Sequence, residues 1–133
     1  YFTFGVDYRV SEVKLGRIYP NLDPSLVTSL SGSSRGTLHL FTLDSRFNHP
    51  SGFFGGIEAQ WWAQDLGGQL ASLHGDDFWQ LNSLVGYRSP RRHVEVVLGV
   101  LNINGSDYRL HPISLYPELP RERTFFARLS LNF

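Results

Sequence analysis

The chain has 133 residues, no cysteine, no methionine, and twelve basic against twelve acidic side chains, which gives a formal net charge of zero. This balance excludes a strong basic patch for nucleic acid and an acidic excess that would favour disorder. Without cysteine there is neither a disulfide framework nor a thiolate metal site. Charged residues make up 18%, below the roughly 25% of ordinary soluble domains. Apolar runs are too short for a transmembrane helix.

Period-two alternation of apolar and polar residues predicts about six β-strands. After Val10 the phase of the alternation changes, which suggests a bulge in the first strand. A helical turn is possible within 23–30. The predicted strands lie at about 1–16, 36–48, 53–63, 77–88, 93–103 and 123–133.

The connections between these strands alternate between long and short. The gaps that begin near positions 17, 64 and 104 are long, whereas 49–52 and 89–92 are short turns. Antiparallel outer-membrane barrels have long external loops and short periplasmic turns. We therefore predict an all-β, antiparallel, up-and-down transmembrane β-barrel segment.

Each of the two short turns suggests a register between the strands it joins, in which apolar residues lie opposite apolar residues and polar residues opposite polar ones. Pairing Phe47 with Phe53 places Leu43 opposite Ile57. A one-residue slip would put apolar side chains opposite polar ones. In the second hairpin, pairing Arg88 with His93 similarly places Tyr87 opposite Val94 and Val85 opposite Val96.

Eight charged residues of the predicted strands fall on one face. A lipid-facing arginine or lysine costs about 2–4 kcal/mol at the midplane, so we expect these residues to face the lumen. Aromatic residues near the ends of the other face would form two girdles at the membrane boundaries. The predicted lumen-facing charges are Asp7, Arg9, Asp44, Arg46, Glu58, Arg88, Glu95 and Arg128, and the predicted lipid-facing or girdle residues are Phe2, Phe47, Phe53, Trp61, Trp79, Tyr87 and Phe133.

The alternation of apolar and polar residues does not by itself show whether the apolar face points outward to lipid or inward to a core. A soluble β-sandwich or barrel would show the same pattern with its apolar face inward. Strands of about ten residues suit a tilted membrane crossing, and the last segment ends on the aromatic Phe133. Because membrane barrels start at about eight strands, we expect residues 1–133 to be the C-terminal part of a larger barrel, incomplete without earlier strands.

Two stretches resemble a known family. The segment Leu98-Gly-Val-Leu-Asn-Ile-Asn-Gly-Ser-Asp-Tyr-Arg-Leu110 resembles the penultimate strand of TonB-dependent outer-membrane receptors, with Asn102, Ile103 and Tyr108 matching the family pattern. The end from Leu119 to Phe133 resembles that family's closing strand, although Pro120-Arg-Glu-Arg123 lacks the usual glycine.

The resemblance implies uptake of a scarce ligand, such as an iron chelate, a vitamin or a glycan, across the bacterial outer membrane. The implied partners are outer-membrane lipid, the barrel-assembly machinery through the C-terminal strand, and TonB through an N-terminal plug region that these residues do not include. A porin-like channel or membrane anchor without energy coupling is the alternative, and a soluble binding module is the second alternative.

Candidate chemical sites are few. The five histidines, His39, His49, His74, His93 and His111, show no metal-ligand spacing, so we expect no metal and no cofactor. No nucleophile triad or phosphate loop points to an enzyme. Trp62, Tyr108, Tyr116 and the carboxylates of the loops could contact a ligand at the mouth of the barrel.

Overall fold

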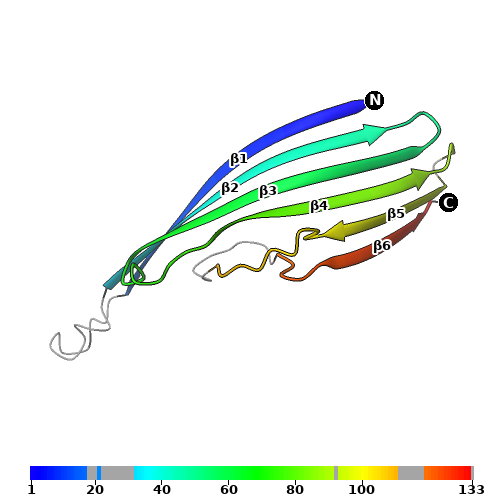
Figure 1. Ribbon diagram of the computed structural model, residues 1–133. Coiled ribbons are helices and arrows are strands. Elements are labelled where there is room, and N and C mark those ends of the chain that lie inside the picture. Colours follow the sequence, from blue (N-terminus) through cyan, green and yellow to red (C-terminus); the bar gives the residue numbers. More distant parts are fainter. Residues whose placement is uncertain (18–20, 22–31, 92, 111–118, 133) are drawn as a thin grey trace.

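The computed structural model describes residues 1–17, 21, 32–91, 93–110 and 119–132. In these residues each strand pairs antiparallel with its neighbour in the chain, giving one sheet of order β1-β2-β3-β4-β5-β6 (Figure 1). The all-β, up-and-down prediction is confirmed, and the described sheet is open, since β1 and β6 are its two edges. The strands are β1 (Phe2–Arg17), β2 (Gly32–Asn48), β3 (Phe53–Gly68), β4 (Asp77–Arg88), β5 (Val94–Leu101) and β6 (Thr124–Leu131). Among the described residues no helix is long and apolar enough to cross a membrane.

β1 and β2 pair without interruption from Phe2 opposite Phe47 to Arg17 opposite Gly32. The predicted bulge after Val10 is therefore wrong. The apolar phase changes there because the side chains on that face become charged, while the backbone continues as a regular strand. The possible helical turn within 23–30 lies outside the described residues.

The β2–β3 turn is longer than predicted. Phe47 lies opposite Gly55 rather than Phe53, a slip of two residues. The turn closes through the N–H of His49, which donates to the carbonyl of Phe53 at 2.8 Å. Gly52 supplies a φ of 98°, which residues with a Cβ rarely adopt.

The β4–β5 register differs from the prediction in the same way. Tyr87 lies opposite Val96 rather than Val94, because the turn closes where the N–H of Ser89 donates to the carbonyl of Val94 at 2.9 Å. Side chains alternate with a period of two. A slip of two residues therefore leaves every side chain on its predicted face.

The first three strands extend past their predicted ends. β2 begins at Gly32 rather than Gly36, and β3 ends at Gly68 rather than Ala63, while β5 already ends at Leu101. Ladder hydrogen bonds involve the backbone alone and continue through glycine, serine and charged residues. The alternation of apolar and polar residues depends on what covers each face of the sheet. It can therefore end before the backbone pairing between the strands ends.

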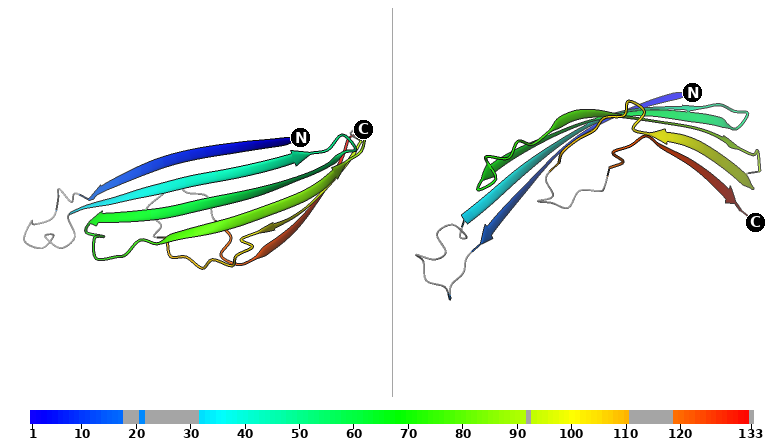
Figure 2. Two further views of the ribbon diagram at one scale, coloured as in Figure 1. Left: turned by 45° about the horizontal axis from the view of Figure 1, so that its top comes forward. Right: turned by 60° about the horizontal axis from the view of Figure 1, so that its bottom comes forward.

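A small apolar core lies on one face of the sheet, at the end away from the two short turns. It contains Leu38, Trp62 and Phe78 from β2–β4 and Tyr108 from the segment after β5, each at most 8% exposed. The Tyr108 and Phe78 rings stack with their centroids 4.6 Å apart. The segment after β5, predicted as an external loop, therefore folds back under the arched sheet (Figure 2).

Asn102 fixes the start of this fold-back. It is fully buried and adopts a φ of 52°, a left-handed conformation that asparagine tolerates. Its Nδ2 donates to the carbonyls of Ser106, Pro120 and Arg121 at 2.9–3.3 Å, and its Oδ1 accepts from the N–H of Ser106 at 2.9 Å. The N–H of Asn102 donates to Oδ1 of Asn82 on β4 at 3.0 Å. One side chain thus ties the end of β5 to the residues before β6.

Candidate functional site

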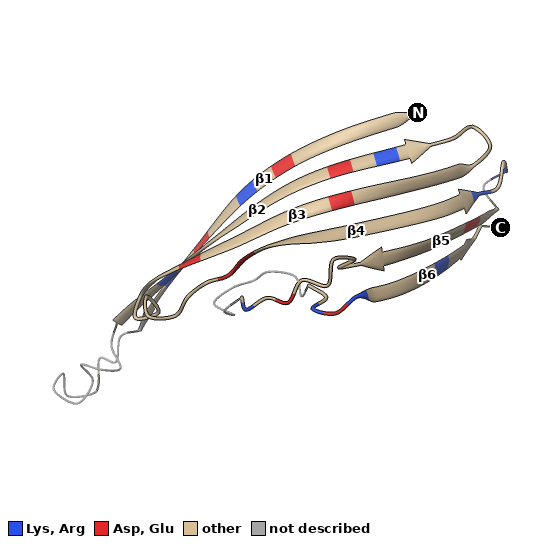
Figure 3. Cartoon of the chain, viewed as in Figure 1, with Lys and Arg blue, Asp and Glu red and all other residues tan. Residues whose placement is uncertain are grey.

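The two faces of the sheet differ in chemistry. The register places the odd-numbered residues of β1 and β5 on the same side as the even-numbered residues of β2, β3, β4 and β6. We call this side the polar face. Figure 3 shows that charged residues are sparse along the strands. The polar face carries all eight charged residues singled out in the sequence, Asp7, Arg9, Asp44, Arg46, Glu58, Arg88, Glu95 and Arg128.

The polar face is the concave one. The fold-back that carries Tyr108 packs against it, and a hollow of about 400 Å³ lies on it nearer the short turns. Inside the hollow, Oε1 of Glu58 accepts hydrogen bonds from Gln60 at 2.9 Å and from Asn82 at 3.0 Å. Such a wall suits water and polar solutes. Its charged and amide lining residues are Asp44, Arg46, Asn48, Glu58, Asn82, Arg88, Glu95 and Arg128.

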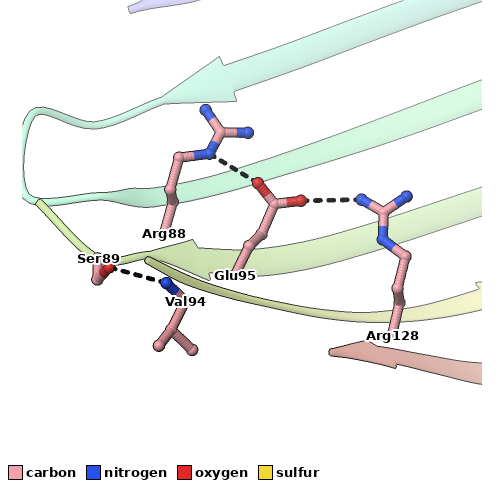
Figure 4. Close-up of polar contacts among 5 residues, drawn as sticks. All are labelled: Arg88, Ser89, Val94, Glu95 and Arg128. Atoms are coloured by element: carbon pink, nitrogen blue, oxygen red, sulfur yellow. Dashed lines mark hydrogen bonds and ion pairs between the residues drawn. The ribbon is translucent and has the colours of Figure 1, made fainter. Parts of the chain in front are cut away.

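Glu95 joins three strands across this hollow. Its Oε2 accepts from Nε of Arg88 on β4 at 2.7 Å, and its Oε1 accepts from Nη2 of Arg128 on β6 at 2.9 Å. Figure 4 shows the three side chains on one side of the sheet and Val94 pointing to the other. The Glu95 side chain is 16% exposed. One carboxylate between two cations therefore favours a fixed spacing of β4, β5 and β6.

We expect Glu95→Gln to lower the denaturant midpoint, because glutamine keeps the size but leaves Arg88 and Arg128 without the charge between them. The loss should shrink in about 1 M salt, where the Debye length falls to about 3 Å. The measurement is urea unfolding of the folded protein at low and high salt. Asp7→Asn is the control, since Asp7 pairs with Arg9 on its own strand. An equal loss in that control would contradict the bridging role.

The opposite, apolar face carries most of the large exposed hydrophobic side chains. Among the described strands, no lysine, arginine, aspartate or glutamate interrupts this face between Phe2 and Val10 on β1, or between Phe53 and Ala63 on β3. The large side chains of this face that are more than half exposed are Phe2, Phe4, Val6, Tyr8, Val10, Phe53, Ile57, Val85, Leu98, Phe125, Leu129 and Leu131.

The band formed by these side chains, here called the apolar band, crosses the sheet obliquely. On β1 it ends at Val10, since Glu12 follows on that face, and on β6 it ends at Phe125. The register makes Phe125 level with Phe4, six positions before Val10. A drop of about 20 Å over five strand spacings of about 4.8 Å each corresponds to a slope of about 40°.

Aromatic side chains gather at the edge of the band near the short turns. The rings of Phe2 and Phe47 have centroids 4.9 Å apart, and so do the rings of Phe53 and Tyr87. These are four of the predicted girdle residues, and the structure brings them together in neighbouring pairs. Phe133, predicted to join them, lies outside the described residues.

A second aromatic row lies at the opposite edge of the band. Trp61 on β3 is directly opposite Trp79 on β4, and the same cross-strand row continues through Phe41 on β2 to Tyr8 on β1. The sequence singled out the two tryptophans. Phe41 and Tyr8 were missed as members of the row, because only the true register makes them level with the tryptophans.

Two residues suggested as ligand contacts are buried instead. Trp62 is 3% and Tyr108 is 6% exposed. The indole N–H of Trp62 donates to Gln60 at 3.2 Å, and the hydroxyl of Tyr108 donates to the carbonyl of Leu119. Their suggested role at the mouth is therefore wrong. The third residue, Tyr116, lies outside the described part of the chain.

In the part of the chain that the structure describes, no three histidine, aspartate or glutamate side chains group closely enough to hold a metal ion. Nδ1 of His39 lies 2.8 Å from the hydroxyl of Tyr8, and its Nε2 lies 3.6 Å from the carboxylate of Asp65. Nδ1 of His49 lies 2.6 Å from the hydroxyl of Ser51. These contacts hold the two histidine side chains in place.

The candidate site is a pair of surfaces, the concave polar face and the opposite apolar face.

No protein-family model, no curated protein and no solved structure matches this chain. What the protein does must therefore follow from the chemistry of its two faces.

Proposed function

We propose that this sheet is part of an outer-membrane β-barrel, with its apolar band against lipid and its polar face toward the interior. The bare apolar band carries the proposal. It covers nine positions on β1 and spans six strands, or roughly 26 Å by 24 Å between the outermost positions. Soluble monomers rarely expose apolar patches larger than about 300–600 Å². A surface of this size needs a nonaqueous neighbour.

The position of the fold-back favours lipid as that neighbour. Tyr108 and Leu119, outside the strands, pack against the polar face, beside Trp62. In a water-soluble sheet the same segment would remove more apolar area from water by covering the apolar band. In the described residues the apolar band stays uncovered, and the fold-back packs on the concave, polar face instead.

The shape of the band also supports a membrane crossing. The apolar band measures about 26 Å along β1, from Phe2 to Val10. If the strands tilt by the slope of the band, about 40°, this length spans about 20 Å across the membrane. Known outer-membrane barrels have an apolar band about 25 Å tall and strand tilts of 35–45°. Aromatic rows at both edges are typical of membrane–water boundaries. The short turns would then lie on the periplasmic side and the long connections outside.

Within this class we propose a receptor of the TonB-dependent type that takes up a scarce ligand, and no enzymatic activity. The support is the resemblance carried by Asn102 and Tyr108, which are the two residues that hold the fold-back in place. The proposed partners are outer-membrane lipid, the barrel-assembly machinery acting through β6, and TonB.

A channel without energy coupling is the second candidate. The fold-back under the arch favours it, because a segment packed on the inner wall narrows the interior without any plug. Loss of substrate uptake in cells that lack TonB would support the receptor, whereas unchanged uptake would support the channel.

The membrane proposal is tested by refolding the protein with and without dodecylmaltoside micelles or phosphatidylcholine vesicles. We expect β-sheet circular dichroism, flotation with vesicles and resistance to urea extraction only when amphiphile is present. A folded, monodisperse monomer in plain buffer would refute the proposal.

A further inference from the structure

Beyond the apolar band, β1 and β2 carry a compact charged cluster on the same face. The first charged residue after Val10 is Glu12, followed by Lys14, which is the only lysine of the chain. Lys14 lies directly opposite Arg35 on β2. At the other edge of the apolar band, β1 and β2 end on this face in Phe2 and Phe47. The apolar face of the described parts of β1 and β2 is therefore basic at one edge of the band only.

Glu12 holds the two cations side by side. Its Oε1 lies 2.5 Å from Nε of Arg35 and 3.5 Å from Nζ of Lys14. The cations remain 60% and 69% exposed. An arginine has five N–H donors and a lysine has three, so one carboxylate cannot satisfy both. The cluster carries a net charge of +1 and presents donors outward, which is the chemistry that recognises a phosphate.

We propose that Lys14 and Arg35 bind the phosphate of a lipid headgroup in the outer leaflet, that of the glycolipid lipid A. This inference rests on the proposed membrane function. It places the pair just outside the aromatic row that contains Tyr8 and Phe41, at the edge with the long connections. The acyl chains of the lipid would then cover the apolar band. The guanidinium of Arg35 would donate two hydrogen bonds to phosphate oxygens, and the ammonium of Lys14 would add a positive charge beside them. Basic residues near a membrane surface strengthen binding to anionic lipid.

The test uses the protein folded in dodecylmaltoside micelles, with bound lipid counted by native mass spectrometry. We expect diphosphorylated lipid A to bind, dephosphorylated lipid A to bind weakly, and millimolar inorganic phosphate not to compete. Lys14→Gln/Arg35→Gln should weaken lipid A binding about thirtyfold. The matched control is Arg9→Gln/Arg46→Gln, which removes the same charge from the same two strands on the polar face and should bind as the wild type does.

Each outcome is decisive. Equal binding by the wild type and the Lys14/Arg35 variant, or equal loss in the Arg9/Arg46 control, would overturn the headgroup site while leaving the membrane proposal intact. Displacement by inorganic phosphate would show a free-anion site instead of a lipid site and would also overturn it. A wild type that is folded and monodisperse in plain buffer would overturn the membrane proposal and the headgroup site together.

Discussion

Leu129→Arg is expected to block membrane assembly. Leu129 is 64% exposed in the apolar band of β6, directly opposite Val96. An arginine there would meet hydrocarbon, at a cost of roughly 2–4 kcal/mol near the midplane. That is a large part of the 5–15 kcal/mol that stabilises a typical domain. The measurement is the folded fraction after reconstitution into vesicles, read from the gel shift between heated and unheated samples.

Ser130→Arg is the matched control for this substitution. It adds the same side chain one position later, on the polar face, where Ser130 lies opposite Glu95. An arginine at this position would point into a hydrated interior and toward an acid, so we expect normal assembly. Equal tolerance of both variants would remove the difference between the faces, and loss of assembly only in Ser130→Arg would reverse their assignment.

Asn102→Ala is expected to destabilise the protein by about 3–4 kcal/mol. The substitution leaves the N–H of Ser106 and the carbonyl of Arg121 without the partner they have in Asn102, and each unpaired buried group costs roughly 1–3 kcal/mol. Alanine at a φ of 52° adds about 1 kcal/mol. Guanidinium unfolding in micelles measures the loss, and trypsin cleavage after Arg109 and Arg121 should become faster as the fold-back opens.

Asn102→Gly separates the two causes. Glycine adopts the left-handed conformation without strain but provides no side-chain hydrogen bonds. We expect it to be about 1 kcal/mol more stable than the alanine variant and still well below the wild type. If glycine restored wild-type stability and protease resistance, the hydrogen bonds of Asn102 would not hold the fold-back.

The division of residues between the two faces and the order of the strands were predictable from the sequence, but the register of the two hairpins was not. Tyr87 and Val96 were placed on the correct face with the wrong partners. A slip of two residues restores the same alternation, so the apolar pattern cannot detect it. Turn geometry decides the register, and the positive φ of Gly52 is set by hydrogen bonds that a run of apolar and polar letters does not encode.

The fold-back escaped prediction because it depends on contacts between residues far apart in the chain. One signal was present in the sequence: Leu38, Trp62 and Phe78 are large apolar residues at positions of the otherwise polar face. Together they form the apolar surface on which Tyr108 packs. The sequence singled out Asn102 only through a resemblance, and the structure shows the four hydrogen bonds that its side chain makes.

The neighbouring tryptophans Trp61 and Trp62 provide the most direct test of which face meets lipid. Trp61 lies on the apolar face opposite Trp79, and Trp62 lies in the core on the polar face. In vesicles whose acyl chains carry bromine, we expect strong fluorescence quenching for the wild type and for Trp62→Phe, but little for Trp61→Phe/Trp79→Phe, in which only Trp62 emits. Quenching of Trp62 alone as strong as that of the wild type, or no quenching in any variant, would contradict a lipid-facing apolar band.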